Sequence, residues 1–510
     1  MIAIFDFGSQ YSKIIARKIR ESHVYCEVLP HNTALHVLKE KKVKGIIFSG
    51  GPSSVFHENS PKANLDLYEA NIPILGICYG MQMMAMQLEG EVIPGDKHEY
   101  GKAILNIDQP MNLFHGFLQE IPIWMSHGDM VIKMPKGFQR LGHTSNCAIA
   151  SMGNYEKKLY GVQFHPEVTH TPKGLEILQN FIYTICDCKP DWTPKSYIKE
   201  ILPSIKKEIK SEKVLCALSG GVDSTVVAFL LKKAIGNQLT CVFIDQGFMR
   251  KDEAKRIEKV FKEFKIKLIY VDASERFFNK VKGVTDPEEK RKLIGEEFIR
   301  VFEEKSKEFQ GTYPFLAQGT LYPDIIESGV GDVPETSVKI KTHHNVGGIP
   351  ENIEFKIIEP LKRLFKDEVR KVGLELGVPE EIVYRQPFPG PGLAIRVLGE
   401  VTPERVKILQ EADAIVMEEI KKVGYYRKLW QAFAILLPIK SVGVQGDKRT
   451  YSNVVAIRAV TSEDAMTANW AHLPYELLES ISSRIINEVP QINRVTYDIS
   501  SKPPATIEWE

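Results

Sequence analysis

Short apolar runs that alternate with stretches of helical pattern most limit how residues 1–190 can fold. The clearest runs are Ile2–Phe5, Gly45–Phe48, Ile72–Ile77 and Leu159–Phe164. Continuous apolar runs of this length are typical of strands that are buried on both faces. Their alternation with helices predicts an α/β domain over residues 1–190, in which helices pack around a sheet.

A second α/β pattern follows a linker at residues 187–196, where two prolines lie among polar residues. We predict strands at Lys213–Leu218, Leu239–Ile244 and Lys267–Val271, and helices at Asp223–Ala234 and Asp252–Phe264. This order is typical of a doubly wound parallel sheet, which we expect to form a domain over residues 191–385. Residues 281–309 are charged and helical in pattern. Residues 329–353, rich in Gly and Pro, predict either a lid over an active site or an ordinary surface loop.

A third region begins at Gln386–Gly392, which contains three prolines and two glycines. Such a segment cannot lie inside a helix or a central strand. Helical patterns at residues 403–422 and 474–488, and β-type runs at 432–444, 453–460 and 492–499, follow it. They predict an α+β domain over residues 386–510.

The composition argues against several partners and locations. The formal net charge of +1 gives no reason to expect a nucleic acid or an anionic membrane surface as partner. The seven cysteines are spaced too irregularly for a disulfide framework or a zinc knuckle. No apolar run approaches the roughly 18 residues that span a bilayer, and the N-terminus has no basic segment. We therefore expect a cytoplasmic protein.

Cys78 lies between a predicted strand and a predicted helix, with Gly76 and Gly80 two residues to either side. Small neighbours permit the sharp turn of a nucleophile elbow, and the helix N-terminus favours the reactive thiolate. A cysteine in an apolar run is otherwise an ordinary core residue. His165 supports the catalytic alternative, because it ends another predicted strand and is followed by Glu167, which can orient the imidazole.

The glycines of Ser49-Gly50-Gly51-Pro52 follow a predicted strand as well. They can bring backbone N–H groups close to a substrate oxygen, so Gly51 and the Tyr79 N–H are candidates for an oxyanion hole. A simple turn is the alternative.

Cys78, His165 and Glu167 in these contexts resemble the triad of the class I glutamine amidotransferases, and the resemblance covers the whole first region. It implies attack of the thiolate on the glutamine side-chain amide, release of ammonia and hydrolysis of a glutamyl thioester. It also implies that Gln82 and His127 line the glutamine pocket.

A second candidate site is the segment Ser219-Gly220-Gly221-Val222-Asp223-Ser224-Thr225, which links a predicted strand to a predicted helix. Its glycine N–H groups, its hydroxyls and the helix N-terminus can hold an anion. It lacks the lysine of the G-x-x-x-x-G-K-[ST] phosphate loop. Because Asp223 would repel a phosphate, a bridging Mg²⁺ is expected at this residue.

The string S-G-G-x-D-S resembles the signature of the ATP pyrophosphatases, which adenylate a substrate oxygen. The resemblance implies ATP as co-substrate and places Asp245 near adenosine and Lys366 near the nucleotide. Adenylation complements a glutaminase, because it converts a poor leaving oxygen into AMP that ammonia can displace.

The glutaminase followed by this loop, together with stretches such as Gln386–Arg396 and Ser501–Glu510, resembles the GMP synthetase family over the full chain. That resemblance implies xanthosine 5′-monophosphate (XMP) as acceptor and a homodimer formed through the C-terminal domain. The expected XMP contacts are Arg291, Gln445, Lys502 and Glu508. A non-catalytic nucleotide sensor and an amidotransferase with another acceptor are the alternatives.

Overall fold

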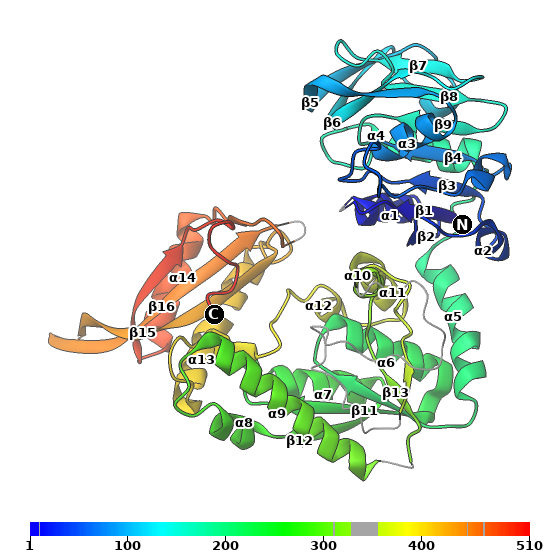
Figure 1. Ribbon diagram of the computed structural model, residues 1–510. Helices are drawn as coiled ribbons and strands as arrows, with labels where there is room; N and C mark the ends of the chain where they lie inside the picture. Colours follow the sequence, from blue (N-terminus) through cyan, green and yellow to red (C-terminus); the bar gives the residue numbers. More distant parts are fainter. Residues whose placement is uncertain (10, 310–311, 328–354, 446, 463–464) are drawn as a thin grey trace. The chain divides into compact units, whose positions relative to one another are not determined.

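The computed structural model describes residues 1–510 apart from residues 10, 310–311, 328–354, 446 and 463–464 (Figure 1). The chain divides into two compact units. Met1–Tyr197 lies in the first unit, and Ile198–Asp324 and residues 355–510 lie in the second. The loop that we predicted at residues 329–353 falls outside the described residues.

A nine-stranded sheet forms the centre of the first unit, in the order β2-β1-β3-β4-β9-β8-β7-β5-β6. The strands are β1 (Ile2–Asp6), β2 (Cys26–Pro30), β3 (Gly45–Phe48), β4 (Ile74–Ile77), β5 (Glu91–Ile107), β6 (Glu120–Lys133), β7 (Gln139–His143), β8 (Ser151–Asn154) and β9 (Leu159–Val162). The first five strands of the sheet order are parallel, and the remaining pairs are antiparallel. The four predicted strands are confirmed as β1, β3, β4 and β9.

The helices of the first unit are α1 (Ser12–Glu21), α2 (Leu35–Glu40), α3 (Tyr79–Gln87) and α4 (Gly174–Gln179). Short helical turns lie at Leu65–Glu69, Asn112–Phe114 and Asn180–Ile185. The predicted linker at residues 187–196 packs against the first unit. Its Trp192 is 8% exposed and contacts the rings of Tyr25 and Tyr197.

The second unit contains a five-stranded parallel sheet in the order β12-β11-β10-β13-β14. Its strands are β10 (Val214–Leu218), β11 (Leu239–Asp245), β12 (Lys267–Asp272), β13 (Phe315–Ala317) and β14 (Lys356–Ile358). Its helices are α5 (Pro194–Ile209), which starts in the first unit, α6 (Val222–Ile235), α7 (Glu253–Glu263), α8 (Ser274–Lys280), α9 (Pro287–Glu308), α10 (Tyr322–Glu327), which from Ile325 on is assigned to the first unit, α11 (Lys366–Glu375) and α12 (Glu380–Val383). The predicted doubly wound parallel sheet is confirmed. Strand order reverses between β10 and β13, where such sheets bind ligands.

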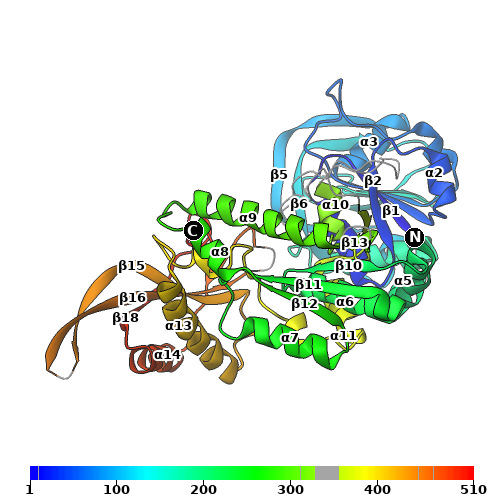
Figure 2. The same ribbon diagram turned by 90° about the horizontal axis from the view of Figure 1, so that it is seen from below.

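A second sheet completes this unit, formed by β15 (Gln431–Gln445), β16 (Lys448–Thr461), β17 (Asn469–Trp470) and β18 (Ile492–Asp498). Helices α13 (Pro403–Lys422) and α14 (Tyr475–Glu488) pack beside it (Figure 2). One apolar core runs from Val242 and Phe248 through Leu393 and Ile415 to Val455. The predicted α+β character of this region is therefore confirmed. None of the described helices is long and apolar enough to cross a membrane.

Candidate active sites

Cys78 occupies a strained turn between β4 and α3, with φ 49° and ψ −107°. Its neighbours must be glycines. A Cβ on Gly76 would lie 2.7 Å from the backbone of Gly80, and a Cβ on Gly80 would lie 2.7 Å from Phe48. The elbow geometry predicted from the Gly-x-Cys-x-Gly spacing is therefore present. Any larger side chain at Gly76 or Gly80 would force the strand and the helix apart.

His165 and Glu167 follow β9, which is the neighbour of β4 in the sheet. His165 Nδ1 lies 2.7 Å from Glu167 Oε1, and the residues are 3% and 0% exposed. Burial acts to lower the pKa of His165, but the charge of Glu167 and a hydrogen bond with Cys78 hold that pKa well above its ordinary value. The structure thus brings the three predicted residues together, with the imidazole ring between a carboxylate and a thiol whose interactions favour its charged form.

The Ser49–Pro52 segment approaches this group closely. A Cβ on Gly50 would lie 3.2 Å from His165 Cε1 and 3.9 Å from Cys78 Cβ. A Cβ on Gly51 would lie 2.9 Å from the Phe7 carbonyl oxygen. Both positions therefore favour glycine, and Gly50, which we predicted only as part of the segment, is the nearer of the two to His165. The oxyanion-hole role of Gly51 and Tyr79 stays a prediction.

Gln82 and Gln163 connect the thiol to the neighbouring strand. Gln82 Nε2 donates to the Asp129 carbonyl at 2.7 Å and to Gln163 Oε1 at 3.3 Å. Gln163 Nε2 lies 3.7 Å from Cys78 Sγ. Gln163 carries no sequence signal beyond its position two residues before His165, at the end of a predicted strand.

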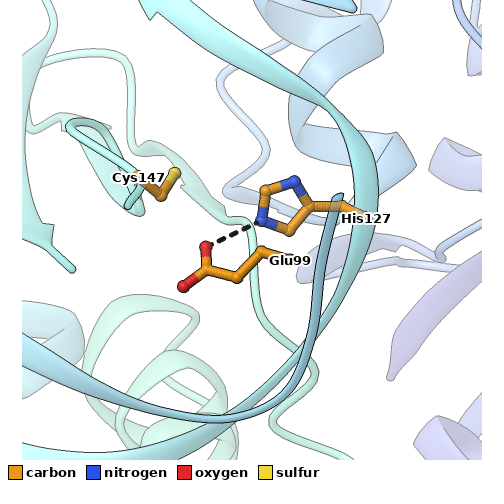
Figure 3. Close-up of side chains that lie close together, drawn as sticks. All are labelled: Glu99, His127 and Cys147. Atoms are coloured by element: carbon orange, nitrogen blue, oxygen red, sulfur yellow. Dashed lines mark hydrogen bonds and ion pairs between the residues drawn. The ribbon is translucent and has the colours of Figure 1, made fainter. Parts of the chain in front are cut away.

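His127 turns its ring away from bulk solvent. Its Nδ1 lies 3.0 Å from the Asp129 carbonyl oxygen, and its Nε2 lies 3.3 Å from Glu99 Oε2 (Figure 3). Burial lowers the pKa of His127, against the opposing effect of Glu99. The side chain is therefore engaged within the protein, and its contribution to glutamine binding stays a prediction.

The Ser219–Thr225 loop leaves the end of β10 and opens α6, next to the reversal of strand order. Gly220 has φ +73°, which favours glycine there. Thr225 Oγ1 donates to the Gly221 carbonyl at 2.9 Å, and the Ser219 and Ser224 hydroxyls lie 3.3 Å apart. These bonds hold the loop in a turn at the N-terminus of α6, a position that suits anion binding.

Asp223 and Lys366 form an ion pair across this loop. Asp223 Oδ1 is buried and has no hydrogen-bond partner among the described residues, so a carboxylate oxygen is available to a cation. The predicted adenosine contact, Asp245, is engaged by the Gly247 N–H at 2.8 Å and by the Tyr270 hydroxyl at 2.6 Å. Arg385, which we did not predict, donates to the Gly220 carbonyl and pairs with Glu253.

The predicted XMP contacts lie around the C-terminal tail of the second unit. Glu508 receives bonds from Arg396 at 2.8 and 3.0 Å and from Gln431 at 2.6 Å. Lys502 Nζ donates to the Ala465 carbonyl at 2.8 Å, and Arg291 donates to the main-chain oxygen of Glu510. The side chain of Gln445 lies outside the described part of the chain. A cavity of about 510 Å³ beside the tail is lined by Asp498, Ser500, Thr506, Glu508 and Trp509, among others.

Fold and sites together define a class: a glutamine amidotransferase joined to a nucleotide-using α/β domain of the ATP pyrophosphatase type. Residues 3–185 match the family model described as glutamine amidotransferase class-I, and residues 195–296 match the one described as NAD synthase. Residues 418–509 match the model of the GMP synthase C terminal domain.

Relatives of similar length identify the family within that class. A GMP synthase [glutamine-hydrolyzing] from Thermosynechococcus vestitus is 58% identical, and the match covers 100% of this chain and 96% of that protein. Proteins with the same name from Clostridium botulinum and Nostoc punctiforme are 56% and 58% identical, again over 100% of this chain and over 99% and 95% of their own lengths. The chain belongs to the family of glutamine-hydrolysing GMP synthases, which are ligases that use glutamine as amide donor.

Proposed function

We propose that this chain converts XMP, ATP, glutamine and water into GMP, AMP, pyrophosphate and glutamate. The observation that carries the proposal is the presence on one chain of the Cys78–His165–Glu167 group and of the Ser219–Thr225 loop at the reversal of a parallel sheet. The first can release ammonia and the second can hold ATP, while the full-length relatives support XMP as acceptor.

In the glutaminase step, the Cys78 thiolate attacks the amide carbon of the glutamine side chain. The His165 imidazolium gives its proton to the departing ammonia, and the ring then accepts a proton from the water that hydrolyses the glutamyl thioester. Glu167 holds the ring in orientation and stabilises its charged form. Backbone N–H groups of Gly51 and Tyr79 stabilise the oxyanion.

In the second step, the XMP oxygen attacks the α-phosphate of ATP, pyrophosphate leaves, and ammonia then displaces AMP. The N–H groups and hydroxyls of Ser219–Thr225 bind the phosphates, with Lys366 beside them. Asp223 would hold Mg²⁺ through its unpartnered Oδ1, and the ion would neutralise charge on the departing pyrophosphate.

XMP binds at the C-terminal tail in this proposal. Arg458 supports this placement, because it donates to the carbonyls of Ser500 and Thr506 at 2.5 and 3.0 Å and thereby fixes the segment that lines the cavity. Lys502 and Arg291 supply positive charge for the 5′-phosphate, and Gln445 and Glu508 contact the base or ribose.

We further propose three domains at residues 1–190, 191–385 and 386–510, a homodimer formed through the last of them, and a cytoplasmic location. The three family-model matches support the division. Exposed apolar residues on the β15–β16 hairpin support the dimer. Val444 is 74%, Tyr451 60% and Ile439 56% exposed.

The test traces the oxygen at C2 of the xanthine base from XMP into the products. XMP labelled with ¹⁸O at C2 is incubated with the protein, ATP, Mg²⁺ and glutamine, and the products are analysed by mass spectrometry. We expect GMP without the label and AMP that carries one ¹⁸O, because ammonia displaces that oxygen as part of AMP. Label in inorganic phosphate with formation of ADP would overturn the adenylation step, and the absence of GMP would overturn XMP as acceptor.

A further inference from the structure

Three potential metal ligands from separate parts of the first unit converge on one point (Figure 3). Glu99 on β5 and His127 on β6 are directly opposed cross-strand partners, and Cys147 lies between β7 and β8. A carboxylate oxygen, an imidazole nitrogen and the thiol sulfur all lie within 4.8 Å of one another. His127 and Cys147 are 4% and 0% exposed, and the Glu99 side chain is 11% exposed.

The hydrogen bond at His127 Nδ1 determines whether the other ring nitrogen, Nε2, is a donor or an acceptor. The Asp129 carbonyl, 3.0 Å from Nδ1, can only accept a hydrogen bond, so Nδ1 carries the proton. In the neutral ring Nε2 is then an acceptor, and it faces the acceptor Oε2 of Glu99 at 3.3 Å. Two facing acceptors call for a proton or a cation between them. An Nδ1–H bonded to a carbonyl is also the usual outer contact of a metal-binding histidine.

Thr144 fixes the other two side chains relative to each other. Its Oγ1 donates to Glu99 Oε1 at 3.3 Å and accepts from the Cys147 N–H at 2.9 Å. The Thr144 N–H donates to the Cys147 carbonyl at 2.9 Å, which closes the turn that directs the thiol inward. The cluster therefore has its own supporting hydrogen bonds, apart from those of the Cys78 site.

We propose that Glu99, His127 and Cys147 bind one divalent metal ion of the zinc type. Nitrogen, sulfur and carboxylate oxygen donors in a buried site are the set that Zn²⁺ prefers. A tetrahedral zinc ion with bonds of about 2.0–2.3 Å keeps its ligand atoms about 3.3–3.8 Å apart, so the side chains need to close by about 1 Å at most. The Cys147 thiol releases its proton to solvent when the ion binds, and water completes the fourth position.

The position of this metal site suggests what it does. Ser126, next to His127, has its carbonyl 3.6 Å from Cys78 Sγ, and the Asp129 carbonyl accepts from Gln82. A metal ion would tie this stretch of β6 to β5 and to the Cys147 turn. It would thereby hold the wall of the candidate glutamine pocket in place.

The test measures metal binding without turnover, so that its outcome is independent of the proposed reaction. The full-length chain carries Cys78→Ala, which removes the other thiol that lies beside a histidine. It is loaded with Co²⁺ as the probe, dialysed, and analysed for metal content and for the thiolate-to-cobalt absorption band. We expect a thiolate band that corresponds to one Co²⁺ per chain and that Zn²⁺ removes.

Three further substitutions in the Cys78→Ala chain assign the site, and each protein is checked for folding by circular dichroism. Cys147→Ala should abolish the thiolate band, whereas Cys26→Ala, which removes a buried thiol from β2, should keep it. Glu99→Gln retains the thiol and should weaken Co²⁺ binding by at least about 10-fold. Absence of bound metal, a thiolate band that persists in Cys147→Ala, or unchanged affinity in Glu99→Gln would overturn the proposal.

Discussion

At the scale of single residues, the partners of His165 set its charge. Burial alone would leave the ring neutral, but Glu167 and Cys78 keep its pKa well above the ordinary value. A raised pKa means that the imidazolium persists to higher pH than in an ordinary histidine and is lost as the pH rises through that pKa. In the proposed mechanism the imidazolium protonates the leaving ammonia, so the alkaline limit of glutaminase activity reports this group.

Glu167→Gln should move that alkaline limit to lower pH, because it removes the charge that raises the pKa and leaves the burial that lowers it. We also expect kcat for glutamate release to fall about 10²- to 10⁴-fold, as when a triad carboxylate is neutralised. The measurement is the pH dependence of glutamate release. Glu176→Gln, an exposed glutamate on α4, serves as control and should leave the profile unchanged. An unshifted alkaline limit in Glu167→Gln would count against the role of the carboxylate.

The sequence predicted the reactive residues better than their supporting contacts. Cys78, His165 and Asp223 lie at strand ends beside glycine or within short motifs, and such signals are local. Gln163 and Arg385 carry no comparable signal, because their importance comes from the thiol and the Gly220 carbonyl that the folded chain brings to them. For Glu508, the residue itself could be predicted from the sequence but its partner could not. Its carboxylate is recognisable in the tail, but its partner Arg396 lies 112 residues earlier.

At the scale of elements, the β4–Cys78–α3 turn depends on glycine for steric reasons. Gly80→Ala would place a Cβ 2.7 Å from Phe48, including its carbonyl oxygen, and neither backbone can yield easily. We expect a loss of about 1–3 kcal/mol of stability in the first unit and loss of glutamine-dependent activity. The measurement is thermal unfolding together with glutamate release.

Gly295→Ala on α9 is the matched control, because a Cβ there meets nothing within 4 Å. It should stabilise the helix by about 0.5–1 kcal/mol, the opposite sign. Equal unfolding temperatures for Gly80→Ala and the unsubstituted chain would show that the turn tolerates a side chain.

A separate prediction concerns Asp223, the acidic residue of the Ser219–Thr225 loop. Asp223→Asn preserves shape but removes the charge that pairs with Lys366 and that would hold Mg²⁺. Pyrophosphate release, measured with ammonium as nitrogen source so that the thiol is not needed, should fall about 10²- to 10³-fold. Asp367→Asn, beside Lys366 on α11, should retain nearly full activity. Wild-type pyrophosphate release by Asp223→Asn would remove this residue from the site.

Parallel strands were easier to predict than antiparallel ones. β1, β3, β4, β10 and β11 are buried on both sides and are therefore continuous apolar runs. By contrast β5 and β6 contain glycines and charged residues, because part of each strand faces solvent. Their pairing, which creates the Glu99–His127 contact, depends on a register that no local pattern specifies.

At the scale of the whole molecule, the β15–β16 hairpin is the element best suited to join two copies, because it extends beyond the other strands of its sheet (Figure 1). Val442 and Val444 alternate along β15 and share one exposed face. The double variant Val442→Asp/Val444→Asp should shift the sedimentation mass from about twice 57.8 kDa to the monomer value. Leu118→Asp, at an exposed apolar position in the first unit, should remain dimeric. A monomeric unsubstituted chain at micromolar concentration would exclude the proposed dimer.

In the proposed reaction one chain divides the chemistry between two sites, and Cys78 is needed only to free ammonia from glutamine. The most direct measurement is a product assay with ATP, Mg²⁺ and XMP, supplied with either glutamine or ammonium, on the unsubstituted chain and on Cys78→Ala. We predict GMP, AMP and pyrophosphate from the unsubstituted chain with both nitrogen sources, and from Cys78→Ala with ammonium alone. GMP formation by Cys78→Ala from glutamine, or loss of its ammonium-dependent activity in a folded protein, would show that the two sites do not divide the reaction in this way.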